Sequence, residues 1–240
     1  MSYIFNTFFY NPLYNGLIYL IDIVPGGDAG VAVVLLTVIV SLILFSISKK
    51  AIRSQMKLRE LEPELTIIKK IEDKQEQARQ MLALYSKNQI NPFSMILLMF
   101  IQIPILFALY KVFYSGGLPL VHQEILYSFV VAPENINMIF LGIVDISKKS
   151  ILIAIFAGIT QFIQAKLMTK NAPKKSENPS MSEGFAHSMN MQMKYTLPVI
   201  ITIFGLSLPS ALPLYWTTRN IFTILQEIFL KKDKKDKKVK

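Results

Sequence analysis

Cysteine is absent from the sequence, which excludes disulfide bonds, thiolate metal sites and a lipid-modified N-terminal cysteine. No lysine or arginine precedes Lys49, so the basic start of a secretory signal peptide is missing. The glycines between Pro25 and Gly30 lack both the dinucleotide-binding spacing and the following lysine of a phosphate site. The missing spacing and the missing lysine argue against a nucleotide-binding site.

Charge is scarce inside several long apolar runs. Hydrophobic residues make up 52% of the 240-residue sequence and charged residues 18%, with a mean hydropathy of +0.40. This balance excludes an ordinary soluble domain, and runs of about 20 apolar residues cross a bilayer as helices. We expect an all-α polytopic membrane protein with five transmembrane helices. The expected spans are about 29–48, 92–114, 151–168, 194–208 and 212–230, the last two separated by the break at Pro209–Pro213.

The basic residues are concentrated between the spans. The net charge is +10, and 22 of the 26 basic residues lie in Lys49–Lys87, Lys166–Lys194 and Lys231–Lys240. Cytoplasmic segments of membrane proteins carry such an excess of lysine and arginine. The distribution therefore predicts a cytoplasmic C-terminus and an N-terminus outside, and it favours a membrane protein over a nucleic-acid-binding one.

Two segments outside the spans have helical patterns. Residues 1–27 are aromatic and apolar but too interrupted to span, and we expect a helix in the outer interface; a partly disordered apolar arm is the alternative. Residues 50–90 predict a cytoplasmic two-helix hairpin, kinked at Pro63 and turning at Glu72–Lys74. The core then comprises residues 28–230.

Two further segments follow from composition. Residues 115–149 form an expected outer loop with a re-entrant-looking apolar patch at Met138–Val144. Residues 231–240 form a basic tail that cannot bury anything. Ribosomal RNA and anionic lipid are both candidate partners for its lysines, and a topological stop signal is the alternative. The candidate tail residues are Lys231, Lys232, Lys234, Lys235, Lys237 and Lys238.

Arg219 stands in the expected fifth span with apolar sequence on both sides. By helical rise it lies roughly 17 Å from Lys231, too deep for easy snorkelling, although a snorkelling arginine near a helix end is the alternative. An ionisable group at this depth usually faces a partner or water. We expect no carboxylate inside a span, so Arg219 is predicted to face a hydrated cavity.

Polar residues on several spans are candidates for lining that cavity. Each alone has a simpler explanation, since amides and hydroxyls commonly join membrane helices by hydrogen bonds worth about 1 kcal/mol. His122 and His187 lie in loops expected on opposite sides, so no metal pair or serine–histidine site can form, and neither enzyme activity nor a cofactor is expected. The expected groove residues are Arg219, Trp216, Asn220, Thr223, Ser41, Gln102, Gln161 and Gln164.

The order of an interfacial segment, a span, a charged hairpin and four more spans resembles the YidC/Oxa family of membrane-protein insertases, in its compact form without a large extracytoplasmic domain. The resemblance covers roughly residues 10–230. It rests on local sequences at Leu61-Glu62-Pro63, Ala83-Leu84-Tyr85, Asn91-Pro92, Ile101-Gln102-Ile103-Pro104-Ile105, Ala108-Leu109-Tyr110, Phe162-Ile163-Gln164, Leu208-Pro209-Ser210, Leu214-Tyr215-Trp216 and Asn220.

One departure from the family pattern concerns the groove charge. The family usually carries an arginine in its first conserved span, where this sequence has Ser41, roughly 12 Å from Lys49 by helical rise. Arg219 stands where relatives usually have a small or polar residue. Because the two positions lie at similar depth, we expect Arg219 to supply the missing charge.

The resemblance implies an insertase and chaperone of the bacterial cytoplasmic (inner) membrane that needs no nucleotide. A hydrophilic substrate segment would enter a groove open to cytoplasm and lipid, which lowers the cost of crossing. Expected partners are new membrane proteins and lipid, with the ribosome and the Sec translocon as candidates, and no DNA. A small channel or transporter component is the alternative, although it would not need the charged hairpin, and a tethering protein would not need a buried arginine.

Overall fold

Helices form nearly all of the regular structure in the computed structural model, which describes residues 3–91, 93–115, 117–168 and 191–239. In chain order the first half comprises α1 (Tyr3–Phe5), η1 (Asn6–Tyr10), α2 (Asn11–Ile23), η2 (Pro25–Gly27), α3 (Ala29–Ile43), α4 (Phe45–Glu60), α5 (Glu62–Lys69), α6 (Lys74–Lys87), α7 (Phe93–Tyr110) and η3 (Lys111–Ser115). The second half comprises η4 (Gln123–Ile125), β1 (Ile139–Phe140), β2 (Val144–Asp145), α8 (Ile151–Met168), η5 (Gln192–Thr196), α10 (Leu197–Ser207) and α11 (Ala211–Val239).

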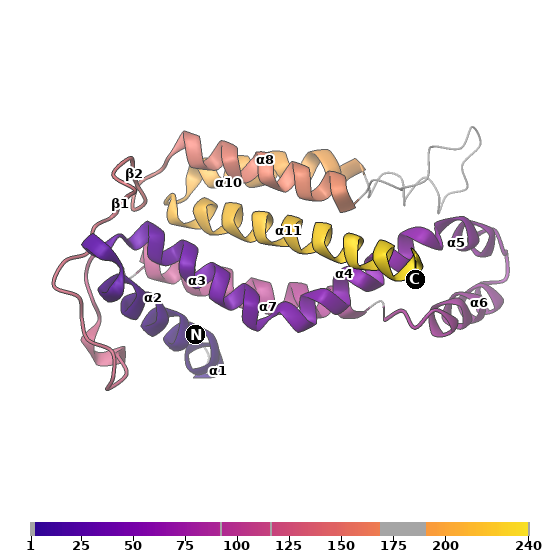
Figure 1. Cartoon of the computed structure of the whole chain (residues 1–240), viewed down its shortest axis with the longest axis horizontal. Coiled ribbons are helices and arrows are strands. Elements are labelled where there is room, and N and C mark those ends of the chain that lie inside the picture. Colours follow the sequence, from indigo (N-terminus) through magenta and orange to yellow (C-terminus); the bar gives the residue numbers. More distant parts are fainter. Residues whose placement is uncertain (1–2, 92, 116, 169–190, 240) are drawn as a thin grey trace.

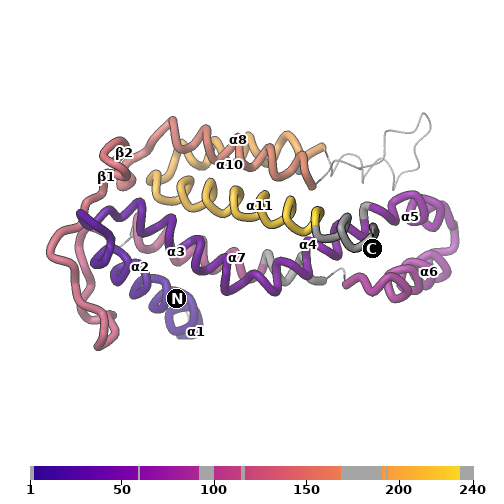
Figure 2. Tube along the Cα trace, viewed as in Figure 1, coloured from indigo at the N-terminus to yellow at the C-terminus, as the bar shows by residue number. Residues whose placement is uncertain are grey.

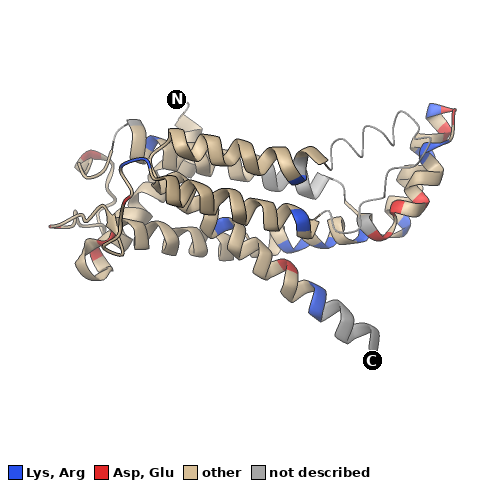
Figure 3. Ribbon diagram, turned by 90° about the horizontal axis from the view of Figure 1, so that it is seen from above, with Lys and Arg blue, Asp and Glu red and all other residues tan. Residues whose placement is uncertain are grey.

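The long helices run side by side along the longest axis of the molecule (Figure 1). One end, here called the loop end, carries residues 117–150; the opposite end, the basic end, carries α5 and α6. In the tube view, α11 passes between α8 and α10 on one side and α3 and α7 on the other (Figure 2). Charged residues gather toward the basic end, while the middle of the bundle is mostly uncharged (Figure 3).

The main core lies where α2 packs against α3. Tyr14, Leu17, Ile18 and Ile21 on one face of α2 are fully buried against apolar residues of the neighbouring helices. Residues 3–23 are helical, and Tyr3, Ile4, Phe8, Tyr19 and Ile23 are exposed along them. Their position at a membrane interface stays a prediction.

The expected continuous span 29–48 is interrupted. Helix α3 ends at Ile43, Leu44 has φ −82° and ψ 0°, and α4 continues at 69° to α3. No proline or glycine marks this break in the sequence. Beyond it, Ile52 and Met56 of α4 pack against Leu230 of α11, so a tertiary contact accompanies the new direction.

The charged hairpin has the predicted form. Its first arm consists of α4 and α5, which separate at Leu61, next to Pro63 at the start of α5. The Asp73 carboxylate caps α6 by accepting from the backbone N–H of Gln75 at 2.8 Å. The arms bury Leu65 and Leu84.

The remaining expected spans correspond to α7 with η3, α8, η5 with α10, and α11. Among the described residues, α8 alone is long and apolar enough to cross a membrane by itself, and α3 with α4 qualifies as a bent pair; these are tests of length and composition only. The structure therefore shows an all-helical bundle, and the count of five spans stays a prediction.

At the loop end, Met138–Val144 contributes to a β-hairpin rather than to a re-entrant helix. Ile139 pairs with Asp145 and Phe140 with Val144. A three-residue turn closes the hairpin, in which the Ile143 N–H donates to the Phe140 carbonyl at 2.9 Å. Exposure alternates from Met138 to Leu141, with Ile139 and Leu141 exposed and Met138 and Phe140 partly buried, as is typical of a strand.

Candidate functional site

Arg219 and Ser41 meet in the interior of the bundle. Arg219 lies on α11 with 9% of its surface exposed, and Ser41 lies on α3 and is almost completely buried. The Arg219 Nη1 donates a hydrogen bond to the Ser41 Oγ at 3.0 Å. The two positions that the sequence placed at similar depth are therefore in direct contact.

This contact satisfies part of the guanidinium with a neutral partner. Five N–H groups need acceptors, and one serine hydroxyl supplies one. Among the described residues no carboxylate forms an ion pair with Arg219. Insertion of an arginine at the centre of a membrane helix costs about 2.5–3.5 kcal/mol on translocon-based scales, so the site retains a strong attraction for an anionic group.

Two further expected residues lie next to Arg219 on α11. Asn220 is buried, and its Nδ2 donates to the Thr160 Oγ1 of α8 at 3.3 Å. Thr223 is buried one turn further along and donates to the Arg219 carbonyl at 3.0 Å. Arg219 therefore points toward α3 while Asn220 reaches α8, so α11 presents polar groups to both neighbours.

The remaining expected groove residues divide between two places. The Gln102 side chain on α7 forms a close hydrogen bond with the Tyr215 hydroxyl, one turn before Arg219. Trp216 is partly buried against the main core. Gln161 and Gln164 on α8 are half-buried. Whether all eight residues line one groove stays a prediction.

Gln164 has an unusual environment. Its Oε1 is buried and has no hydrogen-bond partner, and among the described residues only Asn6 has a second such oxygen. A buried amide oxygen without a partner costs roughly 1–3 kcal/mol, so water or a bound polar group at this position would be stabilising. This supports the expectation that α8 contributes to a hydrated region.

A second polar pair joins α11 to α4, which sequence reasoning missed. The Gln226 Nε2 donates to the Ser48 Oγ at 2.9 Å and lies 3.4 Å from the Phe45 carbonyl, directly after the break at Leu44. Both Ser48 and Gln226 are buried. The sequence holds a partial signal, because Gln226 follows Arg219 by seven residues on the uninterrupted helix α11 and therefore lies on a similar face. Ser48 follows Ser41 by the same spacing, but the break at Leu44 separates those two residues.

Glu227 corrects the expectation that no carboxylate lies inside a span. It falls within the expected span 212–230 and is only 1% exposed. Its Oε1 lies 2.9 Å from the Lys231 Nζ, one turn further along α11. Glu227 lies four residues before Lys231, the first residue of the lysine run.

The expected basic tail is not a separate segment, since α11 continues through it to Val239. Lys231, the first residue of the tail, is paired with the buried Glu227. Lys232 is exposed. The side chains of Lys234, Lys235, Lys237 and Lys238 lie outside the described part of the structure.

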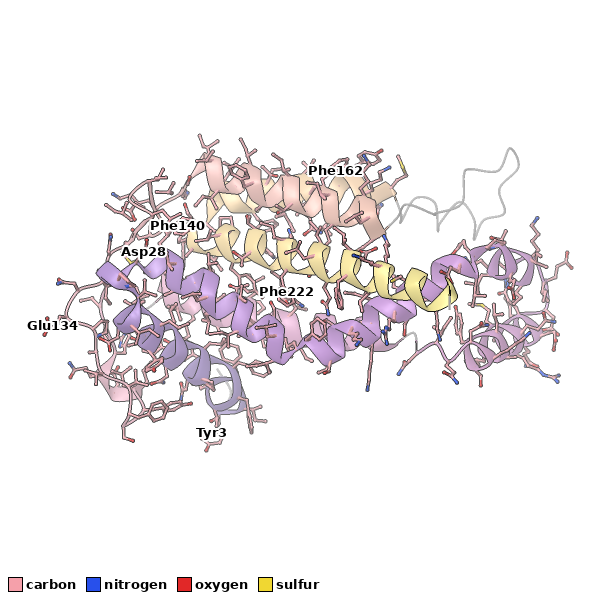
Figure 4. The ribbon with its side chains drawn as sticks, in the orientation of Figure 1. Tyr3, Asp28, Glu134, Phe140, Phe162 and Phe222 are labelled. Atoms are coloured by element: carbon pink, nitrogen blue, oxygen red, sulfur yellow. The ribbon has the colours of Figure 1, made fainter. Side chains whose placement is uncertain are left out.

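Opposite to these polar contacts, the bundle presents apolar side chains outward. Helix α11 exposes Ile221, Leu225, Ile228 and Phe229 on the face that points away from Arg219. Helices α3, α8 and α10 also expose rows of leucine, isoleucine, valine and phenylalanine. Apolar surface of this extent marks contact with lipid or protein rather than water. In the stick view Phe162 lies on α8 and Phe222 between α11 and α3 (Figure 4).

No group of three or more potential acidic, histidine or cysteine metal ligands occurs among the described residues. His122 lies 2.8 Å from Glu124 in the loop, and His187 falls outside the described residues. Hydrogen bonding to its own backbone and to His122 lowers the pKa of the exposed Glu124 carboxyl. The polar residues around Arg219 therefore form a site that can act through charge and hydrogen bonding.

Comparison with known proteins identifies the family. Residues 21–238 match the family model described as 60Kd inner membrane protein. The chain is 31% identical over 216 residues to "Membrane protein insertase YidC" of Rickettsia massiliae (strain Mtu5), covering 86% of this chain and 36% of that protein. It therefore spans about a third of the length of that relative.

A second relative is of more similar length. "Membrane protein insertase YidC 2" of Bacillus anthracis is 30% identical over 234 residues, which cover 95% of this chain and 81% of that protein. Both the family model and this relative extend across the helical bundle and α4–α6. The chain belongs to the 60Kd inner membrane protein family, which includes the YidC-type insertases that its sequence resembles.

Proposed function

We propose that this chain is a membrane-protein insertase in which Arg219 provides the charge of the substrate groove. The observation that carries the proposal is the buried Arg219–Ser41 hydrogen bond between α11 and α3. Family membership supports insertion as the activity, because the relatives are named membrane protein insertases. The Arg219–Ser41 contact supports the residue assignment.

The mechanism is a reduction of desolvation cost. A hydrophilic segment of a new membrane protein enters between α3 and α11 from the basic end. There it replaces the Ser41 hydroxyl as the partner of Arg219. A substrate carboxylate binds the guanidinium more strongly than a neutral hydroxyl does, because both groups are charged. The apolar part of the substrate then moves into lipid along the exposed faces of α8, α10 and α11.

The polar residues around Arg219 have supporting roles in this proposal. Asn220, Thr160 and Thr223 offer further hydrogen bonds to a substrate backbone that has left water. Gln161 and the partnerless oxygen of Gln164 extend the polar surface along α8. Gln102 and Trp216 form its boundary toward the loop end. No cofactor is part of the mechanism.

The experiment that tests the proposal exchanges the two partners. Arg219→Ala is expected to reduce insertion at least about tenfold, equivalent to ~1.4 kcal/mol, in depletion strains and in proteoliposomes. Arg219→Lys retains the charge and should retain most of the activity. Because Ser41 and Arg219 touch, Ser41→Arg combined with Arg219→Ala should restore part of it. Wild-type insertion by Arg219→Ala at normal protein levels would refute the assignment of Arg219.

Crosslinking to nascent chains separates an insertase from the channel or transporter alternative. Crosslinkers placed at Thr223 should capture nascent membrane proteins on stalled ribosomes. Leu225 is the comparison position, because it lies on the exposed apolar face of the same helix. Capture from Thr223 of short hydrophilic substrate segments, and from Leu225 of their apolar segments, is the expected pattern. Absence of any nascent-chain adduct at both positions contradicts insertase activity.

The orientation is part of the proposal: the basic end faces the cytoplasm of a bacterial inner membrane and the loop end faces outside. The chain lacks cysteine, so single cysteines report cleanly. Glu134 in the loop and Glu72 in the hairpin are both exposed glutamates. A cysteine at Glu134 should react with an impermeant thiol reagent in intact cells, and one at Glu72 only after permeabilisation. The reverse result overturns this orientation.

The lysine run is proposed to contact ribosomal RNA, with the Sec translocon as a further candidate partner of the protein. Lys231 is excluded from this role because it pairs with Glu227. Deleting residues 232–240 should weaken ribosome co-sedimentation, and more so at low salt, since the attraction is between opposite charges. Unchanged co-sedimentation leaves the lysines with a topological role only.

A further inference from the structure

The β1–β2 hairpin has one face packed on the bundle and one face exposed. Phe140, Val144 and Ile146 pack inward, and Ile146 is completely buried. The intervening side chains point away: Ile139 is 46% exposed, Leu141 63% and Ile143 74%. Three apolar side chains therefore project from the loop end of the molecule.

The exposed tip is held firmly to α3. The buried Asp28 carboxylate caps α3 by accepting from the Gly30 and Val31 N–H groups. Its second oxygen accepts from the Leu141 N–H at 2.8 Å. The Phe140 ring lies so close to Gly30 that a β-carbon there would be 2.5 Å from the ring. Figure 4 shows Asp28 and Phe140 at the same end of the bundle.

The strand that leaves the hairpin is also tied to α11. The Ser210 N–H donates to the Lys148 carbonyl at 2.8 Å, and the Ala211 N–H donates to the Ile146 carbonyl at 3.1 Å. These bonds hold the residues after β2 against the first turn of α11. One rigid element thereby joins the loop-end termini of the two helices that carry Ser41 and Arg219.

The turn residue Leu141 occupies a conformation that its side chain disfavours. Leu141 has φ +51° and Gly142 has φ +72°, values typical of the two central residues of a type I′ turn. Asparagine followed by glycine is the preferred pair there, and a bulky residue with positive φ is uncommon. A leucine at this position indicates a requirement for an apolar side chain at the tip that outweighs the turn preference.

The surroundings of the tip indicate what covers it. The chain passes from the hairpin into α8, whose first residues Ile151 and Leu152 are exposed and apolar and begin the outward apolar surface of the bundle. Lys149 lies between the two apolar groups and is exposed, and the neighbouring Lys148, also exposed, pairs with the Asp145 carboxylate at 3.0 Å. Apolar side chains interleaved with lysines at the end of a spanning helix suit the lipid headgroup region.

We propose that the β1–β2 hairpin is a membrane-interface anchor, in which Ile139, Leu141 and Ile143 insert at the headgroup boundary of the leaflet at the loop end. Lys149 contacts lipid phosphates beside them. Because the hairpin is bonded to α3 through Asp28 and to α11 through the Lys148 carbonyl, the anchor fixes the depth of the Ser41–Arg219 pair. A protein partner on the same face is the competing occupant, and purified protein in lipid separates the two.

The experiment uses single cysteines labelled with a polarity-sensitive fluorophore in the full-length protein. Ile143→Cys is reconstituted into phosphatidylethanolamine–phosphatidylglycerol vesicles, with Glu134→Cys as the matched control in the same loop, also exposed. At position 143 we expect strong quenching by headgroup-attached and shallow acyl-chain nitroxide lipids and at least about threefold weaker quenching by aqueous iodide than at position 134. Equal iodide quenching at both positions would overturn the anchor and leave the tip for a protein partner.

A second variant distinguishes anchoring from a purely structural role. Leu141→Asn suits the turn conformation and retains the backbone N–H that Asp28 accepts, so the hairpin should remain folded and thermal stability in detergent should not fall. In vesicles, however, the label at position 143 should become more accessible to iodide and less to nitroxide lipid. Unchanged quenching with Leu141→Asn contradicts the proposal whatever the insertion activity of the protein.

Discussion

Helix α10 packs on α8 through small side chains, whereas α11 joins α3 through polar ones. On α8, Gly158 lies so close to α10 that a β-carbon would meet the Thr202 hydroxyl at 2.0 Å, and a β-carbon at Gly205 of α10 would lie 3.1 Å from the Ala154 β-carbon. Between α11 and α3, the contact includes the buried Arg219–Ser41 hydrogen bond. Close backbone approach at small residues stabilises membrane helix pairs, while a buried charge is tolerated for function.

The difference indicates which interface is built to open. Separating α8 from α10 would lose tight van der Waals packing without gaining anything in return. Separating α11 from α3 would release a guanidinium that binds water or a substrate carboxylate better than it binds a serine. We therefore expect α8 and α10 to act as a fixed unit and the α3–α11 side to admit substrate. Three substitutions test this contrast.

The largest expected effect is on the small-residue interface. Gly158→Leu places a side chain where the Thr202 hydroxyl and the Pro198 carbonyl already lie, so α8 and α10 must separate. We expect a loss of several kcal/mol in the free energy of unfolding and little folded protein, measured as thermal unfolding in detergent and as protein level. Ile159→Leu on the exposed face of α8 is the control. Normal stability of Gly158→Leu would mean that this interface is loose.

At the α3–α11 interface, one substitution should abolish activity without lowering stability. Arg219→Ala removes a charge whose burial is costly, so the free energy of unfolding should stay within about 1 kcal/mol of wild type or rise, even though insertion fails. Thermal unfolding of the purified variant, beside its insertion rate, checks this. A large loss of stability would assign Arg219 a structural role and remove the contrast between the two interfaces.

Ser48→Ala sharpens the comparison at the basic end with a smaller effect. It leaves the Gln226 amide without its serine partner next to the break at Leu44. Interhelical hydrogen bonds in membranes contribute about 0.6 kcal/mol on average, so a loss of about 0.5–1.5 kcal/mol in the free energy of unfolding is expected. Ser46→Ala, at an exposed position of the same helix, should have no effect. Equal unfolding curves for the two variants would show that this pair contributes nothing.

Much of this architecture followed from periodicity and hydropathy, because long apolar runs leave few alternatives. The expected span 151–168 has the same bounds as α8. In the charged hairpin, a new helix begins next to Pro63 and another begins after Asp73, where the sequence has local signals for a kink and a turn. The sequence placed Arg219 and Ser41 at similar depth, since helical rise converts sequence distance into height, and the structure adds that the two side chains touch.

Other features depended on contacts between distant segments. The break at Leu44 has no proline or glycine to announce it and coincides with the packing of α4 on α11. The hairpin at Met138–Val144 depends on Asp28, which lies 113 residues away from Leu141 in the chain. The burial of Glu227 likewise depends on how α11 packs, which the sequence around it does not show.

The two polar pairs between α3–α4 and α11 have a common offset. Ser41 and Arg219 are 178 residues apart, and so are Ser48 and Gln226. Ser41 lies on α3 and Ser48 on α4, so the two pairs hold α11 in one register on both sides of the break at Leu44. A slide of α11 by one turn would break both pairs together, because it moves Arg219 away from Ser41 and Gln226 away from Ser48. Rotation or lateral separation can release Arg219 alone, so substrate entry is expected to proceed by parting of the helices and not by a piston movement along the membrane normal.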